Sequence, residues 1–166
     1  MFIATKDTKV IAIHEVEWQC RRNAKGLYKS EYWTWLESVT TVTGTPPDEV
    51  KTVDYSGEDY EIHEVDVDVA GFTASGHIVE NNYHLSWDGS SVSADDDALA
   101  TYQTAEKWKD IRSQRDFLLN ETDWVVVKAN ETGGNVSAAW KKYRQDLRDV
   151  PTQSDPDKIT WPTKPS

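Results

Sequence analysis

Two stretches in the last third of this 166-residue chain repeat their side chains with the period of an α-helix. The positions that share one face are Trp108, Ile111, Arg115 and Leu118 in the first stretch, and Val136, Trp140, Tyr143 and Leu147 in the second. Spacings of three and four residues define such a face. Two short amphipathic helices joined by about sixteen residues bury their apolar faces against each other. The sequence therefore predicts a C-terminal helical hairpin.

The residues around these stretches predict where each helix ends. Residues 120–123 (Asn-Glu-Thr-Asp) favour caps and turns over helix interiors. Gly133 and Gly134 disfavour a regular element, and Pro151 ends the second helix because proline donates no backbone hydrogen bond. The segment 159–162 (Ile-Thr-Trp-Pro) is too proline-rich for a helix. We therefore predict an extended Pro/Trp tail behind the hairpin.

Three side chains of this region have roles that the sequence leaves open. Arg144 and Arg148 lie one turn apart on the second predicted helix, beside its apolar face. They could bind the tail or an acidic side chain internally, contact a partner, or lie idle on the surface. Trp161 of the tail is expected to fold back on the helices.

Four short motifs follow one another along this segment: Arg115–Leu119 (RDFLL), Thr122–Trp124 (TDW), Trp140–Asp149 (WKKYRQDLRD) and Trp161–Pro162. In these motifs, residues from about 108 to 165 resemble the C-terminal domain of the phage tail assembly chaperone and tail-fibre assembly proteins. The resemblance implies a protein of a tailed phage that acts through protein–protein contacts. It does not imply whether the protein stays in the virion.

Residues 1–94 contain a different pattern, that of an antiparallel β-domain. The segments rich in strand-forming residues are 2–5, 10–13, 32–35, 39–42, 50–55, 60–65, 65–69, 77–79 and 83–87. Hairpins are expected between 2–5 and 10–13 and between 50–55 and 60–65. Such short strands predict a sandwich or partial barrel. Asp95, Asp96 and Asp97 indicate a helix start, so the predicted fold is α+β, with domains at 1–94 and 95–166 and all helices in the second.

Exposed aromatic residues are the candidate contacts for a partner protein. Trp33 and Trp35 are predicted to share one strand face, where a partner could add a strand to an open edge. The helical module adds the remaining candidates: Trp124, Trp140, Tyr143, Arg144, Arg148 and Trp161.

Charge and cysteine content narrow the functional classes. The formal net charge of −11 argues against nucleic acid as a partner, because phosphates require clustered lysine and arginine. No apolar run is long enough to span a membrane. Residues 1–7 lack a secretory-signal pattern, and the single cysteine, Cys20, excludes an internal disulfide. We therefore expect assembly in the host cytoplasm, without membrane contact.

No catalytic or cofactor pattern is present in the sequence. His14, His63, His77 and His84 do not have metal-ligand spacings, and the motifs of nucleotide binding and nucleophilic catalysis are missing. A polysaccharide-degrading tail enzyme would need an obvious carboxylate pair. We expect a protein that is not an enzyme and that has no metal site and no cofactor.

Two versions of a phage function remain. In the first, the protein is a structural or accessory component at the fibre or baseplate end of the virion tail, in a homo- or hetero-oligomeric assembly with other phage tail proteins. In the alternative, it is a transient tail or tail-fibre assembly chaperone that does not stay in the virion.

Overall fold

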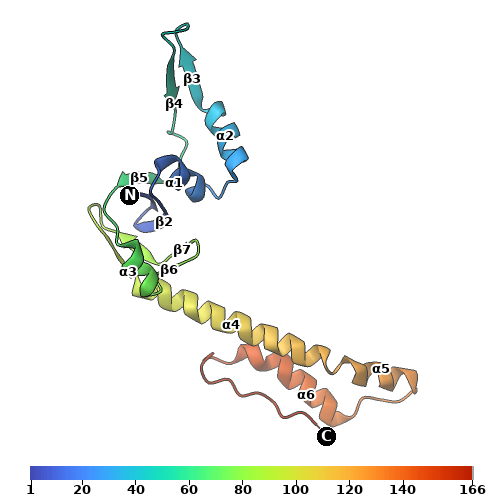
Figure 1. Ribbon diagram of the computed structural model, residues 1–166. Helices are drawn as coiled ribbons and strands as arrows, with labels where there is room; N and C mark the ends of the chain where they lie inside the picture. Colours follow the sequence, from blue (N-terminus) through green and yellow to red (C-terminus); the bar gives the residue numbers. More distant parts are fainter. Residues whose placement is uncertain (166) are drawn as a thin grey trace. The chain divides into compact units, whose positions relative to one another are not determined.

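The computed structural model describes residues 1–165, which form two compact units. The first unit comprises Met1–Leu99 and the second begins at Ala100. Antiparallel strands dominate the first unit and helices the second (Figure 1), so the predicted α+β class is confirmed. The boundary falls inside helix α4, Asp96–Asn120.

The first unit is built on a five-stranded antiparallel sheet with the strand order β5-β1-β2-β8-β9. The strands are β1 (Phe2–Lys6), β2 (Lys9–His14), β5 (Glu61–Glu64), β8 (Leu85–Trp87) and β9 (Val92–Ala94). The predicted hairpin of 2–5 with 10–13 is confirmed, since β1 pairs with β2.

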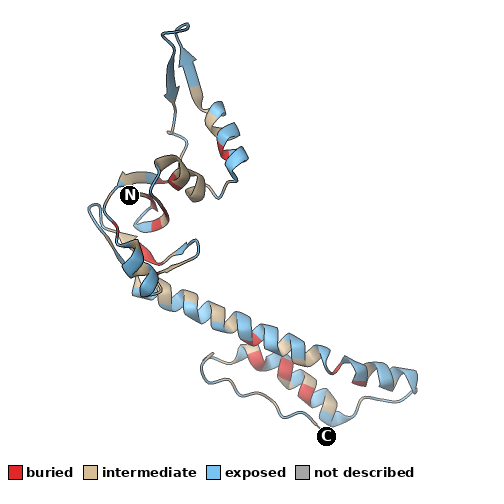
Figure 2. Cartoon of the chain, viewed as in Figure 1, coloured by how far each residue is buried: buried red, intermediate tan, exposed pale blue. Residues whose placement is uncertain are grey.

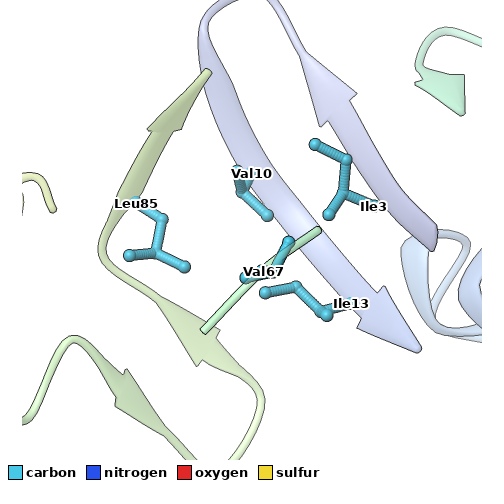
Figure 3. Packing of buried hydrophobic residues seen from close by; sticks show 5 residues of the cluster. All are labelled: Ile3, Val10, Ile13, Val67 and Leu85. Carbon is cyan, nitrogen blue, oxygen red and sulfur yellow. The ribbon is translucent and has the colours of Figure 1, made fainter. Parts of the chain in front are cut away.

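Both faces of the central strands β1 and β2 are covered. One face carries the core cluster of Ile3, Val10, Ile13, Val67 and Leu85 (Figure 3). The opposite face packs a smaller cluster, Ala4, Ala12, Cys20 and Tyr60, in which Cys20 belongs to helix α1 (Glu17–Ala24). Successive residues of a strand lie on opposite faces, so a strand buried on both sides carries a continuous run of apolar residues.

Two small sheets and two more helices complete this unit. The sheets pair β3 (Thr40–Thr43) with β4 (Val50–Val53), and β6 (Ile78–Val79) with β7 (Asn82–Tyr83). The helices are α2 (Lys29–Ser38) and α3 (Val69–Ala74). The antiparallel sheet is thus confirmed, whereas a sandwich or partial barrel is not.

The expectation that helices begin only after residue 95 is wrong, and segment 32–35 lies in α2. The Glu31 carboxylate accepts the Tyr28 backbone N–H at 2.8 Å and caps this helix. Tyr32 is fully buried, with ring centroids of Trp18, Trp33 and Trp35 within 5.9 Å. This packing outweighs the strand preference of the aromatic residues. Trp33 and Trp35 consequently do not share a strand face.

Two further strand predictions are wrong in their pairing or type. Residues 50–55 do not pair with 60–65, because β4 pairs with β3 and β5 pairs with β1. Residues 65–69 form no strand. Instead, Asp68 caps α3 by accepting the Gly71 N–H at 2.9 Å, so the valine alternation ends in a helix start.

The second unit contains three helices. They are α4, α5 (Asp123–Glu131) and α6 (Ala138–Asp149), and α6 continues into the 3₁₀ turn η1 (Val150–Thr152). The two predicted helices are present. The predicted helix start at Asp95–Asp97 is confirmed as the start of α4, where the Asp95 carboxylate accepts the Ala98 N–H at 2.9 Å. Helix α5 lies in the predicted linker. Residues 159–165 form neither helix nor strand.

The environment of Cys20 yields a test of the first unit. The side chain is fully buried, its thiol donates to the Phe2 and Ala12 carbonyls, and burial raises its pKa to about 12. The reactive thiolate is therefore scarce at pH 8. We expect the native protein to resist alkylation by iodoacetamide for hours, as measured by intact mass, and the urea-unfolded protein to react within minutes. Rapid labelling of the native protein would contradict this packing.

Candidate protein-binding site

The turn between α4 and α5 is fixed by Thr122. This residue is 1% exposed, and its hydroxyl donates to the Leu119 carbonyl at 2.8 Å. Its backbone N–H donates to the same carbonyl at 3.0 Å. The last turn of a helix leaves carbonyls without intrahelical donors, and Thr122 supplies donors to one of them. The chain then continues directly into α5.

Arg144 of α6 joins this turn to the next helix. Its Nη1 donates to the Leu119 carbonyl at 3.0 Å and to the Thr122 hydroxyl, and its Nη2 donates to the Asp123 carboxylate at 2.7 Å. The Arg144 side chain is only 11% exposed. One guanidinium therefore connects α6 to the end of α4 and the start of α5. Of the roles left open by the sequence, the structure shows an internal contact for Arg144, made with this turn and not with the tail.

Each of the three helices contributes at least one buried apolar residue. Tyr143 and Leu147 of α6 are buried, as are Ile111 of α4, Val125 of α5 and Val150 of η1. Figure 2 shows the buried positions of α4 and α6 on the sides that face each other. Trp108 and Leu118, predicted for the same cluster, are half-buried.

A row of aromatic rings leads from this interior to the surface. The Tyr143 and Trp140 rings meet edge to face at 5.9 Å between centroids, and Trp140 meets Trp124 in the same way at 6.2 Å. Trp140 is half-buried, whereas Trp124 is 54% exposed. Edge-to-face pairs of this kind hold rings in defined orientations. The exposed indole is thereby oriented by two rings beneath it.

The Trp124 and Trp140 rings line a shallow groove between α5 and the start of α6. We define this aromatic groove by Trp124, Val125, Lys128, Val136 and Trp140, and its volume is about 240 Å³. The Lys128 ammonium lies 5.9 Å from the Trp124 ring centroid, within the range of a cation–π contact. Large apolar rings with one positive charge at the rim suit a peptide segment with apolar and acidic side chains.

The remaining predicted site residues lie outside this groove. Arg148 is exposed, and its side chain forms no hydrogen bond or ion pair with another residue of 1–165. Trp161 is half-buried in the tail. The tail is held by Gln153, whose side-chain amide exchanges hydrogen bonds with the Thr160 backbone at 2.9 and 3.1 Å. Trp33 and Trp35 belong to α2 of the first unit.

Sequence reasoning missed helix α5 and therefore Lys128. The segment 125–127 is three consecutive valines, which favour strands, and this obscured the helix. A signal was present in Asp123, an acidic residue of the first turn, and in Gly133, which lies just beyond the helix with φ 66°. The Thr-Asp-Trp motif was recognised, but its contacts with Arg144 follow only from the structure.

Within residues 1–165, no group of three or more His, Cys, Asp or Glu side chains is arranged to hold a metal ion. No helix in that part of the chain is long and apolar enough to cross a membrane.

Arg144 and Arg148 of α6 provide a matched pair of variants. In Arg144→Lys, the ammonium cannot bridge all three acceptors, and the Leu119 carbonyl and Thr122 hydroxyl lose a charged donor. We expect the free energy of unfolding to fall by about 1–3 kcal/mol. Arg148→Lys, one turn away, should change it by less than about 0.5 kcal/mol. Urea unfolding followed by circular dichroism measures both. Equal effects of the two substitutions would contradict the structural role of Arg144.

Comparison with known proteins identifies the region that contains this groove. Residues 108–166 match a family model described as phage tail assembly chaperone protein. Searches of curated proteins and of solved structures found no match. The matched segment covers the last part of α4, all of α5 and α6, and the tail. It therefore includes Arg144, its three acceptors and every residue of the aromatic groove. By this match, residues 108–166 are similar to the phage tail assembly chaperone family, which supports a role connected with phage tails.

Proposed function

We propose that this protein is a non-enzymatic assembly factor for phage tails, and that its aromatic groove binds a segment of another tail protein. The observation that carries the proposal is the position of Trp124. Its indole is more than half exposed, yet it is held by Trp140 and lies beside Lys128. Exposed tryptophans on a supporting apolar surface are typical of the residues that dominate protein–protein binding energy.

The rigidity of the groove supports binding as its function. Arg144 fixes α5, which carries Trp124 and Lys128, to α6, which carries Trp140. A surface that is ordered before binding loses little conformational freedom when a partner arrives. The family match adds that proteins with this domain are described as tail assembly chaperones. A tail protein is therefore the partner that we propose.

One arrangement in the first unit resembles a catalytic triad, and its geometry favours a structural role. Ser75 Oγ lies 2.9 Å from His77 Nδ1, and His77 Nε2 lies 3.0 Å from the Asp96 carboxylate. However, the Ser75 hydroxyl also lies 3.1 Å from the Phe72 carbonyl, an acceptor that competes with His77 for its hydrogen. The Asp96 side chain is 90% exposed. These contacts connect the end of α3 to the start of α4 and support a protein without enzymatic activity.

Two versions of the function differ in whether the protein stays in the virion. The transient chaperone is the version that the family description supports. Retention at the fibre or baseplate end is the second candidate. It is supported by the first unit, a compact unit of the chain that lies outside the matched segment. Quantitative mass spectrometry of purified particles distinguishes them. A chaperone should fall far below one copy per tail, and a component should match the copy number of its neighbours.

Complementation tests the groove in either version. A phage lacking this protein should form few complete tails, and the native protein supplied in the host should restore them. Trp124→Ala removes the exposed ring of the groove and should lower the yield of infectious particles by at least about 100-fold, as expected for loss of a central contact residue.

Phe117→Ala is the matched control, because Phe117 is a similarly exposed aromatic residue of α4 that does not line the groove. This variant should complement within about threefold of the native protein. Circular dichroism should show that both variants stay folded. Full complementation by folded Trp124→Ala would contradict the proposal.

A further inference from the structure

The β3–β4 hairpin of the first unit lacks the packing that such a hairpin needs. Of its two strands, only Thr40 and Val53 are even partly covered, and the other positions are exposed (Figure 2). An isolated two-stranded sheet is marginal in water, and a third strand or a covering element is needed for stability. The sequence itself is rich in threonine and valine, which favour strands. The hairpin is thus a sheet with a place for one more strand.

The segments on either side of the hairpin are fixed to the first unit. The Lys25 ammonium lies 4.0 Å from the Trp35 ring centroid of α2, and the Arg21 guanidinium lies 3.8 Å from the Tyr55 ring centroid after β4. Arg21 also pairs with Glu58, whose side chain is 4% exposed. The chain therefore enters and leaves the hairpin at defined positions, although the hairpin itself is uncovered.

One face of the hairpin forms a groove. The register pairs Thr40 with Val53 and Val42 with Lys51, so these four side chains lie on one face. Together with Leu36 and Glu37 of α2, they line a cavity of about 340 Å³, which we call the hairpin groove. Its walls are mainly aliphatic, and Val42 is 51% exposed within it. Val50, on the opposite face, is 59% exposed.

The edges of the hairpin are also open to strand addition. An antiparallel ladder leaves alternate N–H and C=O groups of each outer strand unpaired. The edge strand β5 of the main sheet carries Glu61 and Glu64, charges of the kind that discourage pairing with another chain. In β3 and β4, Lys51 is the single charged side chain. The hairpin therefore lacks the protection that β5 has.

We propose that the hairpin accepts an extended, positively charged segment of another protein as a third strand, with its apolar side chains in the hairpin groove. The negative charge of the first unit favours a positively charged occupant. Residues 1–99 contain 7 Lys and Arg against 19 Asp and Glu, a formal charge of −12. Glu37 and Lys51 both line the groove, so the excess of negative charge near it comes from Asp48, Glu49 and Asp54, which flank β4. A second copy of this chain would bring the same negative charge to the interface and be repelled.

This inference goes beyond the proposed function, because it concerns residues 36–53 and the aromatic groove lies within residues 108–166. The test uses the full chain and three fluorescent six-residue peptides: alternating Lys-Val, alternating Glu-Val and alternating Lys-Pro. The Lys-Pro peptide has the charge of the first but cannot pair as a strand, because proline lacks the N–H. Fluorescence anisotropy should give saturable binding for Lys-Val, with affinities at least about tenfold lower for the other two.

Two exposed valines provide the matched variants. Val42→Ser removes an apolar wall of the hairpin groove and should weaken Lys-Val binding by at least about fivefold. Val50→Ser, on the opposite face, should change it by less than about twofold. Trp124→Ala should have no effect on this binding. Loss of peptide binding to the hairpin groove can therefore be distinguished from loss of partner binding to the aromatic groove. Thermal melting should confirm that all variants stay folded.

Three results would overturn the proposal. The first is no saturable binding of the Lys-Val peptide, or equal binding of Lys-Val and Lys-Pro, which would show attraction by charge alone. The second is equal affinity of the Val42→Ser and Val50→Ser variants. The third is a dimer of the unliganded chain in sedimentation that Val42→Ser dissociates, because the occupant would then be a second copy.

Discussion

The contact of Arg144 with the α4–α5 turn is the interaction on which the helical unit depends. A planar guanidinium can donate in several directions at once, and here it serves a backbone carbonyl, a hydroxyl and a carboxylate. The hydroxyl belongs to Thr122, a buried residue, so water does not replace the charged donor that this hydroxyl receives from Arg144. Hydrogen bonds from a charged donor are stronger than neutral ones, so the loss of the guanidinium weakens this turn although Thr122 still donates to the Leu119 carbonyl. Lysine has the charge of arginine but not its shape.

The surface above this contact follows from it. Asp123 and Trp124 are neighbours in sequence, so a guanidinium that holds the Asp123 carboxylate also holds the start of α5. Trp140 lies one helical turn before Arg144 on α6, and its ring orients the Trp124 indole. The Thr-Asp-Trp motif and the Trp-x-x-x-Arg spacing therefore supply the two sides of one set of contacts. These contacts explain why an exposed tryptophan can be part of a rigid groove.

The spacing and type of neighbouring residues predict one hairpin and two helix ends of this fold. The β1–β2 hairpin, the helix start at Asp95–Asp97 and the end of α6 near Pro151 follow from alternation, capping and proline chemistry. The pairing of β4 with β3 and the helical state of Trp33 and Trp35 do not follow from the local sequence. These depend on which segments meet in space, and on the burial of Tyr32 among aromatic rings from two helices. For the site, the sequence indicated Trp124, Trp140 and Arg144, but the groove and Lys128 required α5.

Site-specific crosslinking in infected cells tests directly whether the aromatic groove contacts a tail protein. A benzoylphenylalanine residue that replaces Trp124 lies in the groove, and one that replaces Phe117 lies outside it. After irradiation, mass spectrometry should identify a phage tail protein joined at position 124 and little or no product at position 117. Equal products at both positions, or adducts at position 124 with host proteins alone, would contradict the account.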